Sequence, residues 1–220
     1  MSGRVSKWIV LPAVVLLLGS AALAQDSSST SSSSSQGTSS ASSTQTKPTV
    51  AQRKENQQDR IANGVKSGQL TAGETANLES KEAAINGETR ADRAANGGKL
   101  TTAEKTQINQ QQNQLSKQIY NDKHNANTAH YGNNEVGQRR ENQQDRIANG
   151  IKSGQLTAGE TAKLENQQHA IHQQVAADRA ANGGKLTPGE KQQVNKEQNQ
   201  ASKNIYNKKH NAAQQGGAKK

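Results

Sequence analysis

A seven-residue pattern, G-x-L-T-x-x-E, occurs four times in the chain and divides it into regularly spaced segments. The copies run from Gly68 to Glu74, Gly98 to Glu104, Gly154 to Glu160 and Gly184 to Glu190. Glycine tolerates the positive φ that ends many helices, and threonine is a common N-cap. A glutamate three residues after the threonine completes a capping box. Each copy therefore predicts the end of one helix and the start of the next.

The three fixed polar or small residues of each copy are the predicted helix-cap residues: Gly68, Thr71 and Glu74; Gly98, Thr101 and Glu104; Gly154, Thr157 and Glu160; Gly184, Thr187 and Glu190. The segments between them predict helices over residues 49–66, 72–95 and 102–123, and over the equivalent residues 86 positions later. Sparse apolar residues recur in these segments at helical spacing.

An internal duplication sets the domain organisation. Residues 53–126 align without a gap with residues 139–212, and most aligned positions are identical. The sequence therefore predicts an all-α fold of two tandem three-helix modules. Their expected boundaries are 51–126 and 139–212, with a linker at 127–138 and a basic flexible tail at 213–220.

Each predicted module has few side chains with which to build a core. The chain is 29% hydrophobic and 2% aromatic, with no Phe and no Cys. The first module supplies ten sizeable apolar side chains: Ile61, Val65, Leu70, Leu78, Ile85, Leu100, Ile108, Leu115, Ile119 and Tyr120. The free energy gained by burying these side chains barely offsets the conformational entropy that roughly 70 residues lose on folding. We expect marginal modules, or modules that gain burial by packing on each other or on a partner.

The N-terminal 50 residues read as an export signal and a tether. Arg4 and Lys7 precede an apolar run from Trp8 to Leu18, and an A-x-A cleavage site ends at Ala24. This pattern predicts a signal peptide at 1–24, because the run is shorter than a bilayer span requires. The Ser/Thr-rich segment 25–50 is expected to be a disordered linker. The signal peptide predicts a periplasmic or extracellular protein. The composition of the linker does not decide whether it is glycosylated.

No residue pattern indicates catalysis, a cofactor or a strong metal site. The chain has no Cys and no G-x-S-x-G elbow, and its Asp and Glu residues are mostly at helix caps or interleaved with Lys and Arg, as expected of solvated ion pairs. His169 and His172 have i, i+3 spacing, but no third metal ligand is indicated. We predict a protein that is not an enzyme and has no cofactor.

A longer stretch resembles a known repeat. It comprises DRIANGVKSGQLTAGETANLE at 59–79, ANGGKLTTAE at 95–104 and IYNDKHN at 119–125. Together with its second copy, this pattern is similar to tandem-repeat exported bacterial proteins of uncharacterised function. The resemblance covers 53–212. It implies export and a helical fold, and it implies no particular chemistry.

The four junction motifs also resemble degenerate EF-hand loops. With Glu74 at loop position 12, Gly68 occupies position 6, but Asn63, Val65 and Ser67 fall where calcium needs oxygen ligands. The helix-junction interpretation explains the same residues without a metal. Weak binding of a calcium-type cation remains an alternative function.

The closing I-Y-N-x-K-H-N motif offers a possible contact surface in each repeat: Tyr120, Lys123 and His124, and their equivalents Tyr206, Lys209 and His210. The histidines are also expected to finish their helices. The formal net charge is +10 for the whole chain, which leaves nucleic acid or another polyanion as a further alternative, although bases would find few aromatic rings to stack on. The sequence favours an exported, non-enzymatic binding or structural module whose partner is a protein or an envelope polymer.

Overall fold

The computed structural model describes residues 47–216, which form six α-helices and no strand. The helices are α1 (Val50–Lys66), α2 (Ala72–Ala95), α3 (Thr102–Lys123), α4 (Glu135–Lys152), α5 (Ala158–Ala181) and α6 (Pro188–Lys209). The all-helical prediction is confirmed for this part of the chain. The predicted signal peptide, all but the end of the Ser/Thr linker and residues 217–220 lie outside the described residues. Helix α4 begins inside the predicted 127–138 linker.

The helices begin where side chains satisfy their free N–H groups. Thr71, Thr101, Thr157 and Thr187 each form a capping box with the glutamate three residues later. Helix α1 uses Thr49 with Gln52 in the same way. Helix α4 begins differently, because its N-cap is Asn134, whose side chain accepts a hydrogen bond from Gly137. Every helix start therefore has a polar cap, which offsets the loss of solvation at its first turn.

The glycines after α1 and α2 end their helices in two different ways. Gly68 follows the C-cap Ser67 and has a φ of 71°. After α2 the C-cap is Asn96, so Gly97, at a φ of 60°, takes the position that we expected for Gly98. Gly98 also has a positive φ, and its N–H donates to the carbonyl of Arg93 at 2.7 Å. The second repeat has the same geometry at both junctions.

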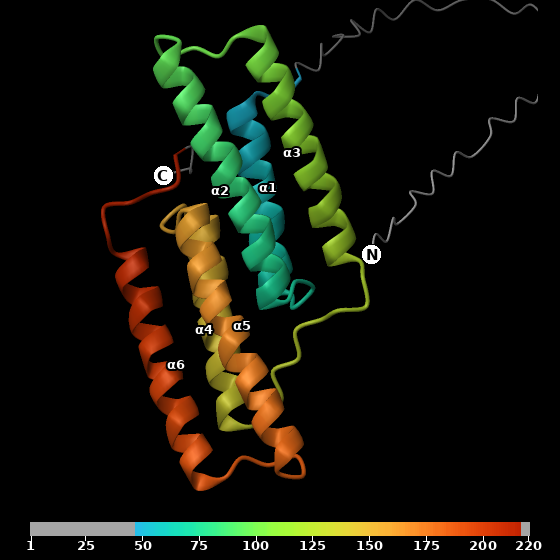
Figure 1. Cartoon of the computed structure of the whole chain (residues 1–220), viewed down its shortest axis with the longest axis vertical. Coiled ribbons are helices and arrows are strands. Elements are labelled where there is room, and N and C mark those ends of the chain that lie inside the picture. Colours follow the sequence, from blue (N-terminus) through green and yellow to red (C-terminus); the bar gives the residue numbers. More distant parts are fainter. Residues whose placement is uncertain (1–46, 217–220) are drawn as a thin grey trace, which may run out of the picture. The chain divides into compact units, whose positions relative to one another are not determined.

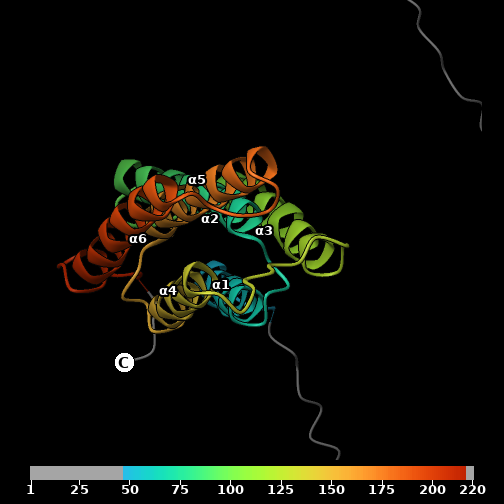
Figure 2. The same ribbon diagram turned by 90° about the horizontal axis from the view of Figure 1, so that it is seen from below.

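Helices from the two repeats pair with each other at the centre of the fold. Helix α1 packs against α4 and α2 against α5, and Figure 1 shows each pair running antiparallel. Helix α3 packs on α1 and α2, while α6 packs on α4 and α5. Figure 2 shows α1 and α4 in one layer, with α2 and α5 in the other. Helices α3 and α6 flank these central pairs on opposite sides.

The α2–α5 contact is close to symmetric. A Cβ at Gly73 would lie 3.1 Å from the His169 ring, and a Cβ at Gly159 would lie 3.9 Å from Ala83. Gly73 is equivalent to Gly159, and His169 is equivalent to Ala83, at a spacing of 86 residues. One contact is therefore the other with the two helices exchanged, as in an isologous interface. Equivalent residues of the two repeats therefore take part in this contact from both sides.

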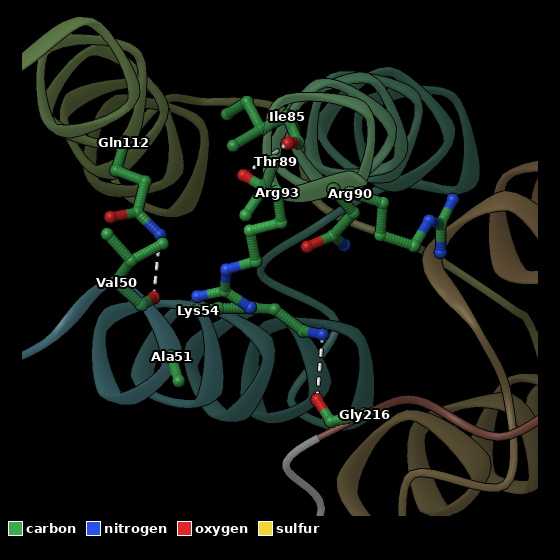
Figure 3. Close-up of a pocket in the computed structure, with 10 residues that line it drawn as sticks. Val50, Ala51, Lys54, Ile85, Thr89, Arg90, Arg93, Gln112 and Gly216 are labelled. Atoms are coloured by element: carbon green, nitrogen blue, oxygen red, sulfur yellow. Dashed lines mark hydrogen bonds between the residues drawn. The ribbon is translucent and has the colours of Figure 1, made fainter. Parts of the chain in front are cut away.

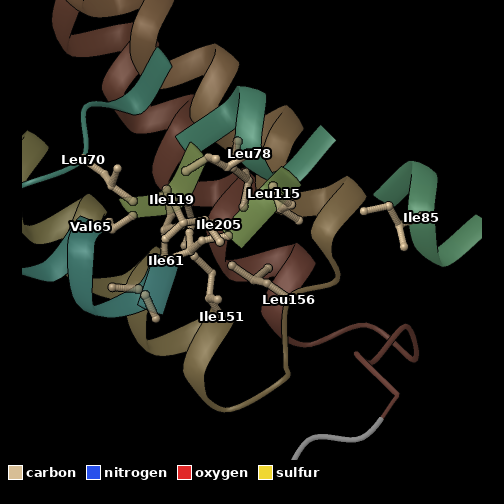
Figure 4. Close-up of a cluster of buried hydrophobic side chains, with 14 of the residues drawn as sticks. Ile61, Val65, Leu70, Leu78, Ile85, Leu115, Ile119, Ile151, Leu156 and Ile205 are labelled. Carbon is tan, nitrogen blue, oxygen red and sulfur yellow. The ribbon is translucent and has the colours of Figure 1, made fainter. Parts of the chain in front are cut away.

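The apolar core is shared between the repeats. Figure 4 shows Ile61, Leu78 and Ile119 of the first repeat clustered with Ile151 and Ile205 of the second. A smaller cluster in the second repeat contains Ile171, Val175, Leu186, Val194 and Ala201. The repeats thus gain burial by packing on each other, one of the two outcomes expected from their small cores. No helix in residues 47–216 is long and apolar enough to cross a membrane.

Tyr120 was expected in the core, and this expectation is wrong. Its side chain is 59% exposed. It follows Ile119, which is fully buried, and adjacent residues of a helix point in directions about 100° apart. One residue of the pair therefore faces the core and the other faces away.

Candidate functional site

Each repeat carries an exposed tyrosine stacked on a histidine at the end of its third helix. The ring centroids of Tyr120 and His124 are 4.2 Å apart, and those of Tyr206 and His210 are 4.1 Å apart. The imidazole Nδ1 of each histidine lies 2.6 to 2.7 Å from the carbonyl oxygen of its tyrosine. The hydrogen bond and the stack hold both rings in place. The structure thus brings the predicted tyrosine and histidine of each contact surface together.

The predicted lysine of each surface is directed elsewhere. The Lys123 Cδ lies 3.3 Å from the position of a Cβ at Gly64, on α1. Lys209 approaches Gly150 on α4 in the same way, at 3.4 Å. Burial lowers the pKa of Lys209, and the nearby charge of Arg146 lowers it further. The lysine stems therefore cover the glycines of the neighbouring helix, and each candidate contact surface reduces to its tyrosine and histidine.

The glutamates of the junction motifs accept hydrogen bonds that hold the structure together. Glu74 Oε2 accepts from the Thr71 N–H at 2.9 Å, and Oε1 accepts from the side chains of Asn125 and Asn127. Burial acts to raise the pKa of Glu74, but the hydrogen bonds from Asn125 and Thr71 outweigh it and lower the pKa. The cap thus ties the segment after α3 to the start of α2.

The equivalent glutamates make similar contacts. Glu160 accepts from Asn211 at 2.6 Å and pairs with Lys208 at 3.6 Å. Glu104 and Glu190 accept from Asn96 and Asn182, the C-cap residues of the preceding helices. No cluster of three or more His, Cys, Asp or Glu side chains suited to a metal occurs among residues 47–216. The geometry of the four motifs fits helix junctions rather than calcium loops.

Three buried glutamates lie on α2 and α5, and sequence reasoning missed them. Glu79 and Glu82 on α2 and Glu165 on α5 have no exposed surface. The expectation of solvated ion-pair partners is wrong for these three. A signal is present for Glu82, which lies three residues before Ile85 on the same face of the helix.

Amide side chains partly satisfy these carboxyl groups. Gln58 on α1 donates to Glu79 at 3.0 Å, and Gln144 on α4 donates to Glu165 at 2.8 Å. The second oxygen of each of these two carboxyl groups has no hydrogen-bond partner. A buried carboxylate without partners is strongly unfavourable, so protonation is the less costly state.

The pKa values follow this environment. Burial raises the pKa of Glu79 to about 8, the bond from Gln58 opposes the shift, and the charges of Glu82 and Glu165 reinforce it. Burial likewise raises the pKa of Glu165 to about 8 and that of Glu82 to about 7. The nearest cations are Lys54, which opposes the shift of Glu82, and Arg140, which opposes that of Glu165. Glu79 and Glu165 are therefore neutral acids at pH 7.

His169 and His172 have separate structural contacts. The His169 ring packs against Gly73 across the α2–α5 contact. His172 Nδ1 lies 2.8 Å from Arg140 Nη1, and burial, followed by the charge of Arg140, lowers the pKa of His172. An imidazole facing a guanidinium is a poor metal ligand, because the metal would add a second positive charge beside the first. The arrangement favours structural roles for both histidines.

Comparison of the chain with protein-family models, curated proteins and solved structures found no match in any of the three.

Proposed function

We propose that the protein is an exported, non-enzymatic helical repeat protein that serves as a binding or structural module of the cell envelope or exterior. In this proposal residues 51–126 and 139–212 are two three-helix modules, and a Ser/Thr-rich tether holds them away from the point of export. Signal-type residues at 1–24 support export. The engagement of the motif glutamates in helix caps supports a role other than chemistry.

The observation that carries the proposal is the duplicated Tyr–His stack. Tyr120 and Tyr206 are 59% and 57% exposed, and they are the large apolar side chains that the described surface displays most openly. Tyrosine combines apolar area with a polar tip, and it is enriched where proteins bind partners. Because His124 and His210 already hold the rings, little side-chain entropy would be lost on binding.

The position of the stacks suggests the kind of partner. They lie on α3 and α6, the helices that flank the central pairs on opposite sides (Figure 1). Two identical surfaces that face apart suit a partner with many identical sites, such as an envelope polymer. Occupying both surfaces would raise the apparent affinity well above that of one, through effective concentration.

Co-sedimentation with isolated cell-wall polymer tests the proposal. The protein lacking residues 1–24 should pellet with the polymer, and a Tyr120→Ala/Tyr206→Ala variant should stay in the supernatant. The matched control is Lys99→Ala/Lys185→Ala, which changes two exposed residues related by the same 86-residue offset. Both variants should keep the melting temperature of the parent. Equal pelleting of the tyrosine variant and the parent would sink the proposal, as would pelleting of neither.

A further inference from the structure

Two pockets lie at equivalent places in the two repeats. The first has a volume of about 300 Å³ and is lined by Val50, Ile85 and Gln112, among other residues. The second has a volume of about 260 Å³, and the residues 86 positions later, Val136, Ile171 and Gln198, line it. The duplication therefore provides an internal comparison of two related sites within one molecule.

The chain segments that follow α3 and α6 approach these pockets along matching paths. The Ala129 N–H donates to the Gly68 carbonyl at 2.8 Å, and the Gln215 N–H donates to the Gly154 carbonyl at 2.9 Å. The next carbonyl oxygen accepts from a cation of each pocket. His130 accepts from Arg140 at 3.4 Å, and in the first pocket Gly216 accepts from Lys54 at 2.7 Å.

After this point the second pocket receives an aromatic ring from its own chain. The Tyr131 ring lies over the Arg140 guanidinium, with 5.0 Å between Cζ and the ring centroid. Tyr131 lines the pocket and is partly buried. The second pocket therefore accepts an aromatic ring against a cation, a favourable pairing.

No aromatic side chain of residues 47–216 lines the first pocket, and two features of the sequence bear on this difference. The residue 86 positions after Tyr131 is Gly217, which has no side chain. In addition, a Cβ at Gly137 would overlap the carbonyl oxygens of Tyr131 and Gly132. The residue equivalent to Gly137 is Ala51. A chain on the equivalent path would meet the Ala51 methyl group.

The first pocket also carries more positive charge. Lys54, Arg90 and Arg93 line it, whereas the second pocket has Arg140, Ala176 and Arg179 at these places. Figure 3 shows the Arg93 side chain reaching toward Lys54, whose ammonium points to the Gly216 carbonyl, while the exposed Arg90 side chain is directed away from both. No carboxylate is among its lining residues. In the part of the chain that the structure describes, the guanidinium groups of Arg90 and Arg93 make no recorded hydrogen bond or ion pair.

Lys54 itself responds to this excess of charge. Burial lowers its pKa, and the charges of Arg90 and Arg93 lower it further, while Glu82 acts in the opposite direction. An anion bound in the pocket would relieve the repulsion among the three cations. A pocket that offers both apolar side chains and guanidinium groups would suit a ligand with a ring at one end and a negative charge at the other.

We propose that the first pocket binds a small aromatic carboxylate, whose ring occupies the place that Tyr131 takes in the second pocket and whose carboxylate pairs with Arg93, with Arg90 adding positive charge at the edge of the pocket. The ring lies against Val50 and Ile85, beside the Lys54 ammonium. Guanidinium groups bind carboxylates through two parallel hydrogen bonds, which makes this end of the ligand the more selective. This site is independent of the Tyr–His surfaces.

Titration with 3-(4-hydroxyphenyl)propionate tests the site, because this probe joins the tyrosine ring to a carboxylate. The probe should perturb amide NMR signals of residues 50–54 and 85–93. Equimolar 4-ethylphenol, which lacks the charge, and propionate, which lacks the ring, should each perturb them much less. Inorganic phosphate that bound as tightly as the probe would overturn ring recognition, and an absence of perturbation at millimolar probe would overturn the site itself.

Variants distinguish this site from its equivalent. Arg90→Gln/Arg93→Gln changes two exposed residues and should weaken probe binding by about tenfold or more, through loss of charge-assisted hydrogen bonds. Arg179→Gln, in the second pocket, should leave the affinity unchanged. Equal effects of the two changes would contradict the assignment. Because Tyr120 and Tyr206 play no part, probe binding should also survive in the Tyr120→Ala/Tyr206→Ala variant, whether or not that variant binds polymer.

Discussion

The carboxyl groups of Glu79 and Glu165 are fully buried at equivalent positions on the paired helices α2 and α5. Burial raises the pKa of each to about 8, and the charges of Glu82 and Glu165 add to the shift of Glu79. At these two positions protonation and stability are therefore linked.

The stability of the protein should fall as the pH rises from about 5 to about 8. The folded pKa of Glu79 and Glu165 is about 8, above the ordinary value of 4.5. The folded state thus binds protons more tightly than the unfolded state in this range. The stabilisation is complete below the unfolded pKa and is lost as the pH rises through the folded pKa. We expect a slope on the order of 1 to 3 kcal/mol per pH unit, measured by urea unfolding at a series of pH values.

The double substitution Glu79→Gln/Glu165→Gln provides the control for that prediction. Glutamine keeps the size and most of the hydrogen bonding of a neutral glutamic acid but does not titrate. The urea midpoint of the variant should depend much less on pH, and it should exceed that of the parent at pH 8. A variant that kept the full pH dependence would show that other groups cause it.

Thr71→Ala should lower the free energy of unfolding by about 1 kcal/mol, because it removes an N-cap. Thr71 Oγ1 accepts from the Glu74 N–H at 3.3 Å and donates to its carboxylate at 2.7 Å. Thr102→Ala is the matched control, since Thr102 is exposed at the first position of α3 and does not cap it. Chemical denaturation measures both. Equal losses in the two variants would mean that the cap itself contributes nothing.

Gly137→Ala should destabilise the protein by more than 1 kcal/mol (about the cost of forcing an extra methyl into a packed site). The added methyl overlaps the Tyr131 carbonyl and must displace the segment that carries the Tyr131 ring. Gly189→Ala serves as the control, because a Cβ there meets nothing within 4 Å. It should be neutral or stabilising by up to about 1 kcal/mol, since alanine is the better helix former. Thermal melting distinguishes the two variants. An unchanged melting temperature in Gly137→Ala would contradict the close contact between Gly137 and the segment that carries Tyr131.

The helix ends could be predicted from the sequence because their causes are local. A threonine and a glutamate three residues apart satisfy each other's neighbouring N–H groups wherever the helix is placed. The junction motifs therefore indicated the bounds of α2, α3, α5 and α6 without any knowledge of packing. The start of α4 at Glu135 was less evident from composition, because its cap, Asn134, lies in a segment with several other polar residues.

The pairing of the repeats could not be predicted because it depends on contacts between residues far apart in the chain. Nothing local distinguishes Glu79, which is buried, from an exposed glutamate such as Glu141. The same limit applies to Tyr120, whose spacing after Ile119 leaves open which of the two faces the core. The relation of Tyr131 to the second pocket also required the folded path of the chain.

The duplicated Tyr–His surface is the central claim, and the most direct test compares single and double tyrosine variants on immobilised cell-wall polymer. If the two surfaces bind together, Tyr120→Ala and Tyr206→Ala should each reduce the apparent affinity by a similar factor of about ten or more, and the double variant should show no measurable binding. Parental affinity in both single variants, or binding that persists in the double variant, would contradict the claim.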